Sequence, residues 1–437
     1  MEISRIRKKK YYAVSVKLAS PLCISSGYDE NTDKDVLRNA CKEVFLPGSS
    51  IAGAWRDYLG QSRNCDGLMG FSEDEKGRMS PIIVQDLYLS ENIRISARDG
   101  VKLDSSKGVI NKFDMEIVET GASGILFFNY TERDNTQWDY ETAIADILRG
   151  MQTGEIRFGA SKNRGMGRLH IDCVYESAFT KEEVDAWIRF SPERKSLSAY
   201  QKHVPYREWA EKHIATRDSR YIHITVPLTL HGGISIRKYS TKPRQADYEH
   251  ITSNGEPVIP GSSWGGAIRS DACRILEDLG CHDMERLVRA WFGSIDDDLK
   301  KKVSDLEMPE DESPEEAHQS QIVIGESILR GAQPVPMTRN KINRFDASTV
   351  DGALYSDISY YGGETELNLM VRKDADAEYE ALLGLLLIII SDLQEGYLPV
   401  GGLVSVGRGI FEAGIDPVKY SETIHEDRCM SKLYSLL

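Results

Sequence analysis

Apolar and polar residues alternate along one segment near the start of each half of the chain. In 11–27 the apolar side chains fall at every second position from Tyr12 to Leu18, and 220–236 repeats the pattern. A period of two with many β-branched residues indicates a strand that buries one face. Both segments end in small residues, so we expect a tight turn after each strand.

A second shared segment follows in both halves. The pattern Pro-Gly-Ser-Ser-x-x-Gly-Ala-x-Arg runs from Pro47 to Arg56 and again from Pro260 to Arg269. A match of this length within one chain indicates a tandem duplication. Proline and glycine predict a turn into a helix that a serine can cap. The small Gly-Ala pair would let a neighbouring strand or a polynucleotide backbone come close.

The remaining elements follow the same order in each half. The pattern predicts a strand, a loop rich in polar and basic residues, a strand, a helix, and a glycine-rich loop before a final strand. The predicted segments are 81–89, 101–118, 124–131 and 137–151 in the first half, and 321–329, 337–358, 364–372 and 375–394 in the second. With the opening strand and helix, this order is the ferredoxin-like βαββαβ order.

The sequence therefore predicts an α+β protein with two tandem ferredoxin-like (RRM-like) domains. We place them at 1–178 and 219–437, with a helical connector at 179–218 and thumb-like and loop insertions. A chain of 437 residues is too long for one ordinary core, and 41% apolar residues are enough to fill two.

Charge and cysteine content narrow the class of protein. The net charge of −14 argues against a uniformly basic surface but allows a local basic groove. Acidic residues gather in 295–318, which we interpret as a solvated surface insertion. Seven scattered cysteines without a CxxC pair argue against a disulfide framework and a zinc site. The apolar run 382–390 is shorter than the roughly 20 residues that span a bilayer, so we expect a cytoplasmic protein without a membrane partner.

The two glycine-rich loops are candidate nucleic-acid contacts. They lack the sequence and context of a Walker or a Rossmann phosphate loop. Glycines expose backbone N–H groups, and nearby cations can neutralise phosphates. The alternative is a tight loop that packs against the first helix. The candidate residues are Gly159, Lys162, Arg164, Gly165, Gly167 and Arg168 in the first loop, and Gly407, Arg408 and Gly409 in the second.

Three features together resemble a known family. The loop pattern GxSxxRGxG from Gly159 to Gly167, the PGSS segment, and the stretch KINRFDASTVDGALY at 341–355 are similar to the RAMP superfamily of CRISPR-associated RNA-binding proteins. Two copies in one chain resemble the fused double backbone subunits of type III-D or related effector complexes. The resemblance implies an antiviral complex with guide RNA (crRNA), target RNA, other RAMP subunits and a large polymerase-like subunit.

The resemblance also implies roles for individual residues. Subunits of this family bind the guide, kink its duplex with a thumb-like hairpin, and cut target RNA at a loop aspartate with a divalent metal such as Mg²⁺. The transferred aspartates are Asp33, with Asp35 as a near alternative, and Asp247, whose alignment needs a gap. Arg56 and Arg269 are expected to contact phosphates, or otherwise to form surface salt bridges. The other implied RNA contacts are Ser49, Ser50, Lys112, Ser262, Ser263, Lys341 and Arg344.

The sequence leaves several functions open. The first is a metal-dependent endoribonuclease that works within the assembled complex. The second is a scaffold subunit that binds crRNA and cuts nothing. A third, suggested by His231 and His250, is a histidine-based endoribonuclease that processes the guide. A duplicated ferredoxin-like scaffold unrelated to RNA is the fourth.

Overall fold

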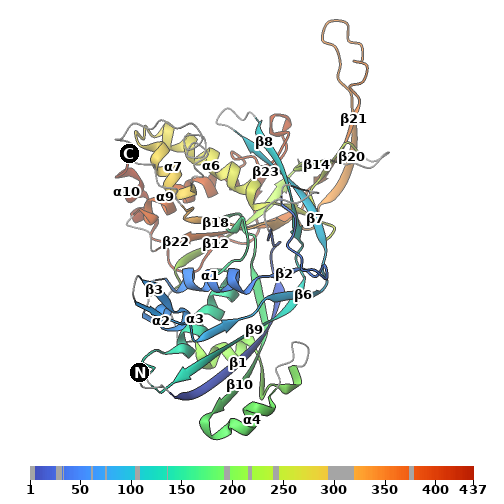
Figure 1. Ribbon diagram of the computed structural model, residues 1–437. Coiled ribbons are helices and arrows are strands. Elements are labelled where there is room, and N and C mark those ends of the chain that lie inside the picture. Colours follow the sequence, from blue (N-terminus) through green and yellow to red (C-terminus); the bar gives the residue numbers. More distant parts are fainter. Residues whose placement is uncertain are drawn as a thin grey trace, which may run out of the picture. The chain divides into compact units, whose positions relative to one another are not determined.

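The computed structural model describes most of the chain (Figure 1). It covers residues 5–437 except 26–31, 33, 61–62, 74–75, 104–108, 135, 191–196, 215–218, 240–245, 294–318 and 374–377. Asp33 and the acidic insertion at 295–318 therefore lie outside the described residues. The chain forms two compact units, Met1–Lys162 with Met166–Asp218, and Asn163–Gly165 with Ser219–Leu437.

The first unit is built on an antiparallel sheet with strand order β11-β10-β1-β9-β6-β2, in which β5 also pairs with β9. Its strands are β1 (Ile6–Leu18), β2 (Phe45–Leu46), β3 (Phe71–Glu73), β4 (Lys76–Arg78), β5 (Ile82–Val84), β6 (Leu87–Glu91), β7 (Ile95–Leu103), β8 (Val109–Val118), β9 (Ser123–Arg133), β10 (Leu169–Thr180) and β11 (Lys202–Pro205). Its helices are α1 (Gly48–Leu59), α2 (Arg63–Met69), α3 (Tyr140–Thr153), α4 (Val184–Arg189) and α5 (Tyr206–His213).

Helices α1 and α3 pack on one face of this sheet and enclose the core of the unit. In α1 the buried residues Ile51, Trp55, Tyr58 and Leu59 recur at the spacing of a single helix face. Helix α3 begins at a side-chain cap, because Asp139 accepts a hydrogen bond from the Thr142 N–H at 3.0 Å. The predicted helix at 137–151 is thus confirmed, with a slightly later start.

The connector covers part of the opposite face of the first sheet. Phe190 and Tyr200 from the connector pack against Tyr11 and Phe127 of the sheet. The indole N–H of Trp187 in α4 donates to the Tyr11 hydroxyl at 2.8 Å. This face is therefore covered by aromatic side chains from the same unit.

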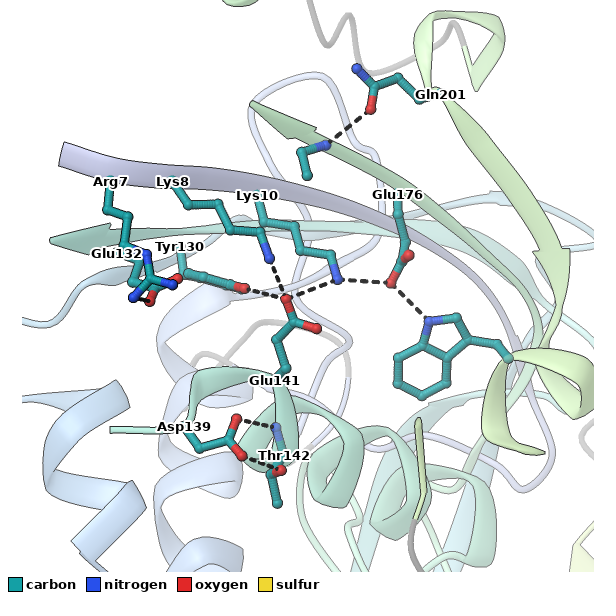
Figure 2. A network of polar contacts seen from close by, with 12 residues as sticks. Arg7, Lys8, Lys10, Tyr130, Glu132, Asp139, Glu141, Thr142, Glu176 and Gln201 are labelled. Atoms are coloured by element: carbon teal, nitrogen blue, oxygen red, sulfur yellow. Dashed lines mark hydrogen bonds and ion pairs between the residues drawn. The ribbon is translucent and has the colours of Figure 1, made fainter. Parts of the chain in front are cut away.

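A network of charged groups is buried between the sheet and α3 (Figure 2). Lys10 is 6% exposed and lies 3.5 Å from Glu141 and 3.4 Å from Glu176. Burial alone would raise the pKa of Glu141, but hydrogen bonds from Lys8 and Tyr130 and the charge of Lys10 lower it to about 2. Each buried charge therefore has an opposite charge beside it.

The second unit repeats the plan with strand order β18-β22-β12-β23. Its strands are β12 (Tyr221–His231), β13 (Gly233–Ile234), β14 (Arg237–Tyr239), β15 (Tyr248–His250), β16 (Thr252–Ser253), β17 (Glu256–Ile259), β18 (Ile322–Ile324), β19 (Ser327–Ile328), β20 (Gln333–Arg339), β21 (Tyr355–Tyr361), β22 (Glu364–Arg372), β23 (Ile410–Ala413) and β24 (Lys419–Tyr420). Its helices are α6 (Gly261–Asp278), α7 (Met284–Phe292), α9 (Tyr379–Gln394) and α10 (Glu426–Tyr434).

Both units have the ferredoxin-like arrangement that the sequence predicts. The fourth strand of the βαββαβ order lies beside the first, and the first beside the third, as β10-β1-β9 and β23-β12-β22. The apolar run at 382–390 forms the buried centre of α9. Helix α10 comes close to α9 at Gly384, where a Cβ would lie 2.6 Å from the Cys429 carbonyl oxygen. No helix among the described residues combines the length and the apolar character needed to cross a membrane.

The predicted strands at 81–89 and 321–329 are each broken in two. The break occurs where the first helix of the unit begins. A Cβ on Gly48 would lie 2.6 Å from the Val84 carbonyl oxygen, and one on Gly261 would lie 2.3 Å from the Ile324 carbonyl oxygen. The start of the helix therefore lies against the backbone at the break, where Gln85 N and Gly325 N still donate to Phe127 O and Asn368 O of the neighbouring strand.

The loops expected at 101–118 and 337–358 contain β-hairpins. Strands β7 and β8 pair with each other in the first unit. Strands β20 and β21 pair in the second, and the segment that joins them extends well past both strands (Figure 1). In β8 the apolar residues Phe113, Met115 and Ile117 alternate with polar residues, which is a strand signal that the interpretation of 101–118 as a loop overlooked.

Candidate nucleic-acid interface

The loop that precedes the PGSS segment has the same strand register in both units. Ser25 forms a bridge with Val36, and Arg237 pairs with His250. In each unit, the residue after Val36 or His250 donates its backbone N–H to the carbonyl of the residue before Ser25 or Arg237. The hydrogen bonds are Leu37 N to Ile24 O at 2.8 Å and Ile251 N to Ile236 O at 2.9 Å. Val36 and His250 therefore occupy equivalent positions.

In this register Asp33 and Asp247 occupy equivalent positions. Asp33 lies three residues before Val36, and Asp247 lies three residues before His250. No gap is needed between each aspartate and this position. The segment before the aspartate is two residues longer in the second unit, and the segment from this position to the PGSS proline is one residue shorter. Asp33 itself is outside the described residues.

Asp35, the near alternative in the first unit, is buried. It is 4% exposed, and its Oδ1 accepts a hydrogen bond from the Thr32 N–H at 3.0 Å. The Thr32 hydroxyl donates to the same oxygen. Asp35 therefore holds the shape of its loop, and its carboxylate is not exposed to a ligand in solution.

Asp247 is exposed and lies at the base of the second hairpin. Its Oδ2 accepts hydrogen bonds from the Ser356 N–H at 2.8 Å and from the Ser356 hydroxyl at 3.2 Å. The Asp247 N–H donates to the Ser356 Oγ at 3.3 Å. The two residues therefore form a reciprocal clamp between the start of β15 and the start of β21.

The tip of the second hairpin exposes large apolar residues beside cations. Ile342, Phe345 and Leu354 are 63%, 92% and 66% exposed. Lys341 and Arg344 are exposed in the same segment. Clustered exposed apolar side chains are typical of a surface that meets a partner. In the first hairpin, Lys112 lies in β8 opposite Val101, and its side chain is outside the described residues.

The arginines of the two first helices make equivalent bonds. An Nη of Arg56 donates to the Met69 carbonyl at 2.7 Å, and one of Arg269 donates to the Gly293 carbonyl at 3.2 Å. Both carbonyls lie at the end of the next helix, where carbonyl groups lack helical partners. Each arginine is exposed and keeps further N–H groups beyond this bond.

The serines of the PGSS segments do not cap their helices. Pro47 and Pro260 occupy the cap positions, and neither helix has a side-chain cap. Instead the Gly48 N–H donates to Asp86 Oδ1 at 2.8 Å. The expected serine cap is therefore wrong. Ser49, Ser50 and Ser262 are exposed in the first turns, and Ser263 is partly exposed.

Of the two expectations for the small residues of these helices, a close contact with a neighbouring strand is not met at Gly53 and Gly266. A Cβ on Gly53 or on Gly266 would meet no atom within 4 Å. The close approach to a neighbouring strand is made at Gly48 and Gly261, one turn earlier. Gly53 and Gly266 therefore leave room on the helix surface without contacting a strand.

The glycine-rich loops pack closely on the turn that follows the first strand of each unit, through backbone hydrogen bonds such as Ala160 N to Cys23 O at 2.8 Å and Gly402 N to Ser235 O at 2.8 Å. A Cβ on Gly159 would lie 2.2 Å from the Cys23 carbonyl oxygen, and one on Gly167 would lie 1.8 Å from the Phe158 carbonyl oxygen. In the second unit, Gly409 comes equally close to the Val400 carbonyl oxygen, at 1.9 Å. These glycines are explained by contacts within the units. All five glycines have left-handed φ values, including 81° at Gly165 and 78° at Gly407, and of these two a Cβ on Gly407 would meet no atom within 4 Å.

Backbone contacts fix how the two loops correspond. The Gly167 N–H donates to the Pro21 carbonyl and the Gly409 N–H to the Gly233 carbonyl, each at 2.8 Å. Short 3₁₀ turns, η1 (Lys162–Arg164) and η4 (Val404–Val406), then match residue for residue. Val404 and Val406 therefore replace Lys162 and Arg164 in the second unit. Arg408 corresponds to Met166 and to none of the cations of the first loop.

The loop cations fall into two groups. Lys162 and Arg164 are exposed. Arg168 is partly buried, burial lowers its pKa, and its guanidinium donates to the Gln152 carbonyl at 3.3 Å near the end of α3. A phosphate contact of Arg168 would therefore compete with this internal bond. Lys162 and Arg164 are exposed and are the stronger candidates for phosphate contacts.

Arg408 connects the second loop to the hairpin. Its guanidinium lies over the Tyr361 ring, 4.5 Å from the centroid, and an Nη lies 3.6 Å from the Met337 sulfur. In the first unit the equivalent Met166 packs against Met115 and Ile117 of β8. Each loop therefore places one side chain on the base of the hairpin in its own unit.

A family model decides the identity. The model of the RAMP superfamily matches residues 15–170 and 227–412, which together make up most of both units. The chain belongs to the RAMP superfamily. Each RAMP region extends from the first strand of a unit, β1 or β12, to the strand after the glycine-rich loop, β10 or β23, and includes the hairpin. A comparison with curated proteins finds no match for the chain. The superfamily is associated with CRISPR effector complexes and RNA binding.

The histidines of the second RAMP unit have different surroundings. His250 is 3% exposed, accepts a hydrogen bond from the Ile236 N–H at Nδ1, and lies 3.0 Å from the Val258 carbonyl at Nε2. Burial lowers its pKa to about 4, so the ring is neutral and Nε2 carries the proton. His231 is exposed, with Nδ1 3.1 Å from Glu412. His250 is thus a structural residue.

Sequence reasoning missed Ser356, Asp86 and the two helices α2 and α7. Ser356 and Asp86 are ordinary polar residues whose role depends on a contact distant in sequence, and no spacing signals it. Within the described ranges, no group of three or more His, Cys, Asp or Glu side chains is arranged to hold a metal ion.

Proposed function

We propose that this double RAMP protein is a backbone subunit of a type III CRISPR effector complex of the III-D-like kind, and that it acts in antiviral defence. It binds crRNA and positions or cleaves complementary target RNA. Its partners are crRNA, target RNA, other RAMP subunits and a large polymerase-like subunit. The family match over both units supports this assignment.

The observation that carries the cleavage proposal is the equivalence of Asp33 and Asp247. Both lie three residues before the same position of the strand register. In the second unit the aspartate is exposed at the base of a hairpin with a cationic, apolar tip. A duplicated chain that keeps an acidic residue at one loop position in both copies fits two sites of the same chemistry.

The cofactor of this reaction would be Mg²⁺ or another divalent ion. Mg²⁺ is commonly held by one or two carboxylates together with substrate phosphates, so a single aspartate per unit fits this ion. Asp33 and Asp247 would hold it, and the ion would neutralise charge that develops on the phosphate. The residues of the chain itself align the RNA: Asp247 is fixed by Ser356, and Lys341, Arg344 and Arg408 attract the phosphates.

The test uses Asp33→Ala and Asp247→Ala singly in the assembled complex. Complementary target RNA with an end label is mapped for cuts at single-nucleotide resolution. Each variant is expected to lose its own regularly spaced subset of the cuts and to keep crRNA binding. Asp57→Ala is the matched control, because Asp57 is an exposed carboxylate on α1 outside this loop. Cutting at every position in both variants would show that the catalytic assignment is wrong.

A second candidate is a scaffold that holds crRNA without cutting. It is favoured by the bonds of Asp247 Oδ2, which both go to Ser356 and not toward open solution. The same experiment separates the two functions, since a scaffold retains target binding but yields no cut in the wild type. His250 does not support the histidine-based alternative, because both of its ring nitrogens have backbone partners, and His231 is the candidate that this alternative keeps.

A further inference from the structure

The orientation of the Asp247 side chain depends on one other residue. Each of its carboxylate hydrogen bonds in the described structure comes from Ser356, through the N–H and the hydroxyl. The Asp247 N–H returns a bond to the Ser356 Oγ. Oδ1 takes part in none of these bonds. Ser356 therefore fixes Oδ2 of Asp247, and Oδ1 receives no hydrogen bond from Ser356.

The strand register explains why these two residues meet. Tyr248 pairs with Asp357 in the parallel contact between β15 and β21. Asp247 and Ser356 are the residues immediately before this pair. The backbone brings them together, and the hydroxyl of Ser356 adds a bond that a residue without a donor cannot make. Loss of the hydroxyl would leave the backbone bond and allow the carboxylate to rotate.

The first unit carries a different residue at the equivalent position. Leu22 forms a bridge with Val118, and the equivalent Ile234 pairs with Tyr360. Counting back four residues from Val118 and Tyr360 makes Asp114 the counterpart of Ser356. An ionised aspartate only accepts hydrogen bonds and cannot donate to a carboxylate. The two units therefore differ at this position, because Ser356 can donate a hydrogen bond to a carboxylate and an ionised Asp114 cannot.

We propose that Ser356 is a positioning residue for the reaction at Asp247, at a position where the first unit carries Asp114. This inference rests on the proposed function. It adds a residue that neither the sequence pattern nor the family match assigns.

The test is Ser356→Ala in the assembled complex, with cuts mapped on end-labelled target RNA. The cuts lost in Asp247→Ala define the second-unit set, and those lost in Asp33→Ala define the first-unit set. Ser356→Ala is expected to slow the second-unit cuts by about tenfold or more, as expected for a misplaced reacting group. First-unit cuts and crRNA affinity are expected to stay unchanged. Ser356→Thr, which keeps the hydroxyl, is expected to restore the rate.

Thr338→Ala is the matched control. Thr338 lies opposite Ser356 in the pairing of β20 with β21, and it is exposed. It makes no hydrogen bond with Asp247, so its loss is expected to leave both sets of cuts unchanged. The rate is measured at saturating target, so that a change in positioning appears in kcat and not in KM. A thermal melt of each variant checks that the second unit is folded.

Three results would overturn the inference. One is an unchanged second-unit rate in Ser356→Ala while Asp247→Ala abolishes these cuts. Another is equal slowing of both sets, which would mean general damage to the hairpin. The third is an unaltered cut pattern in Asp247→Ala itself. That result would also contradict the proposed cleavage at Asp247. Because Asp247→Ala is measured first, this failure is detected before any Ser356 variant is compared.

Discussion

His250 shows how the residue at one buried position can differ between the two copies and take on an additional role. It occupies the position of Val36, an apolar residue of the first unit. The histidine fills the same buried space and in addition bonds the backbone of two neighbouring segments. Its surroundings stabilise the neutral ring, which makes the second unit sensitive to acid in a way that the first is not at this position.

The pH dependence of stability follows from the lowered pKa of His250. Its pKa is about 4 in the folded protein, below the ordinary 6.5, so the unfolded chain binds the proton first. The stabilisation is complete above pH 6.5 and declines as the pH falls toward 4. We expect a loss of about 2 to 3 kcal/mol over this range. The measurement is the free energy of unfolding in urea between pH 8 and pH 4.

Two variants test this assignment. His250→Gln keeps a donor and an acceptor but has no titrating ring, so it should lose less stability over the same pH range than the wild type. His231→Gln serves as the control, because His231 is exposed. If the pH profile of His250→Gln equals that of the wild type, another group causes the acid sensitivity.

At the scale of elements, the glycine-rich loops are held by close backbone contacts. Gly409→Ala should destabilise the second unit by more than about 3 kcal/mol. The added Cβ would lie 1.9 Å from a carbonyl oxygen, and the residue has a φ of 73°. Gly407→Ala is the matched control, since it has a similar φ but meets no atom within 4 Å, and it should cost about 1 to 2 kcal/mol. Denaturant unfolding compares the two; equal losses would contradict the internal role.

The alternating pattern predicted the elements well, but it did not predict their contacts. The strands at Tyr12 and Ile222 and both main helices follow from periodicity, because burial of one face governs those residues. By residue type alone, Arg408 would align with a cation of the first loop. Backbone bonds at Gly409 and Gly167 show that it corresponds to Met166. The clamp of Asp247 joins residues more than a hundred positions apart, and a single sequence carries no signal for such a pair.

At the scale of the whole molecule, the two units differ in charge at equivalent loop turns. Lys162 and Arg164 are exposed in the first loop, and valines take their places in the second. The net charge of −14 makes such local cations important, because the protein as a whole repels a polyanion. RNA binding should therefore depend more on the first loop than on the second.

The double variant Lys162→Val, Arg164→Val should bind crRNA more weakly. It should also reduce the slope of log affinity against log salt by about 1.4, since two phosphate contacts to a single strand are lost. The reciprocal Val404→Lys, Val406→Arg should steepen this slope. Arg207→Ala is the control, because Arg207 is an exposed cation on α5 that pairs with Glu211. The measurement is a salt titration of crRNA binding, and an unchanged slope in the first variant would exclude these contacts.

The aromatic layer beneath the connector limits where the first unit can receive a polynucleotide. RRM-type domains stack bases on the open surface of their sheet. In this chain Phe190 and Tyr200 already lie against Tyr11 and Phe127, so the protein's own side chains cover this part of the sheet surface. A base could stack there only after displacement of the connector. We therefore expect the first unit to bind RNA along its loops and hairpin, because the connector covers these aromatic residues on the face of the sheet opposite the helices.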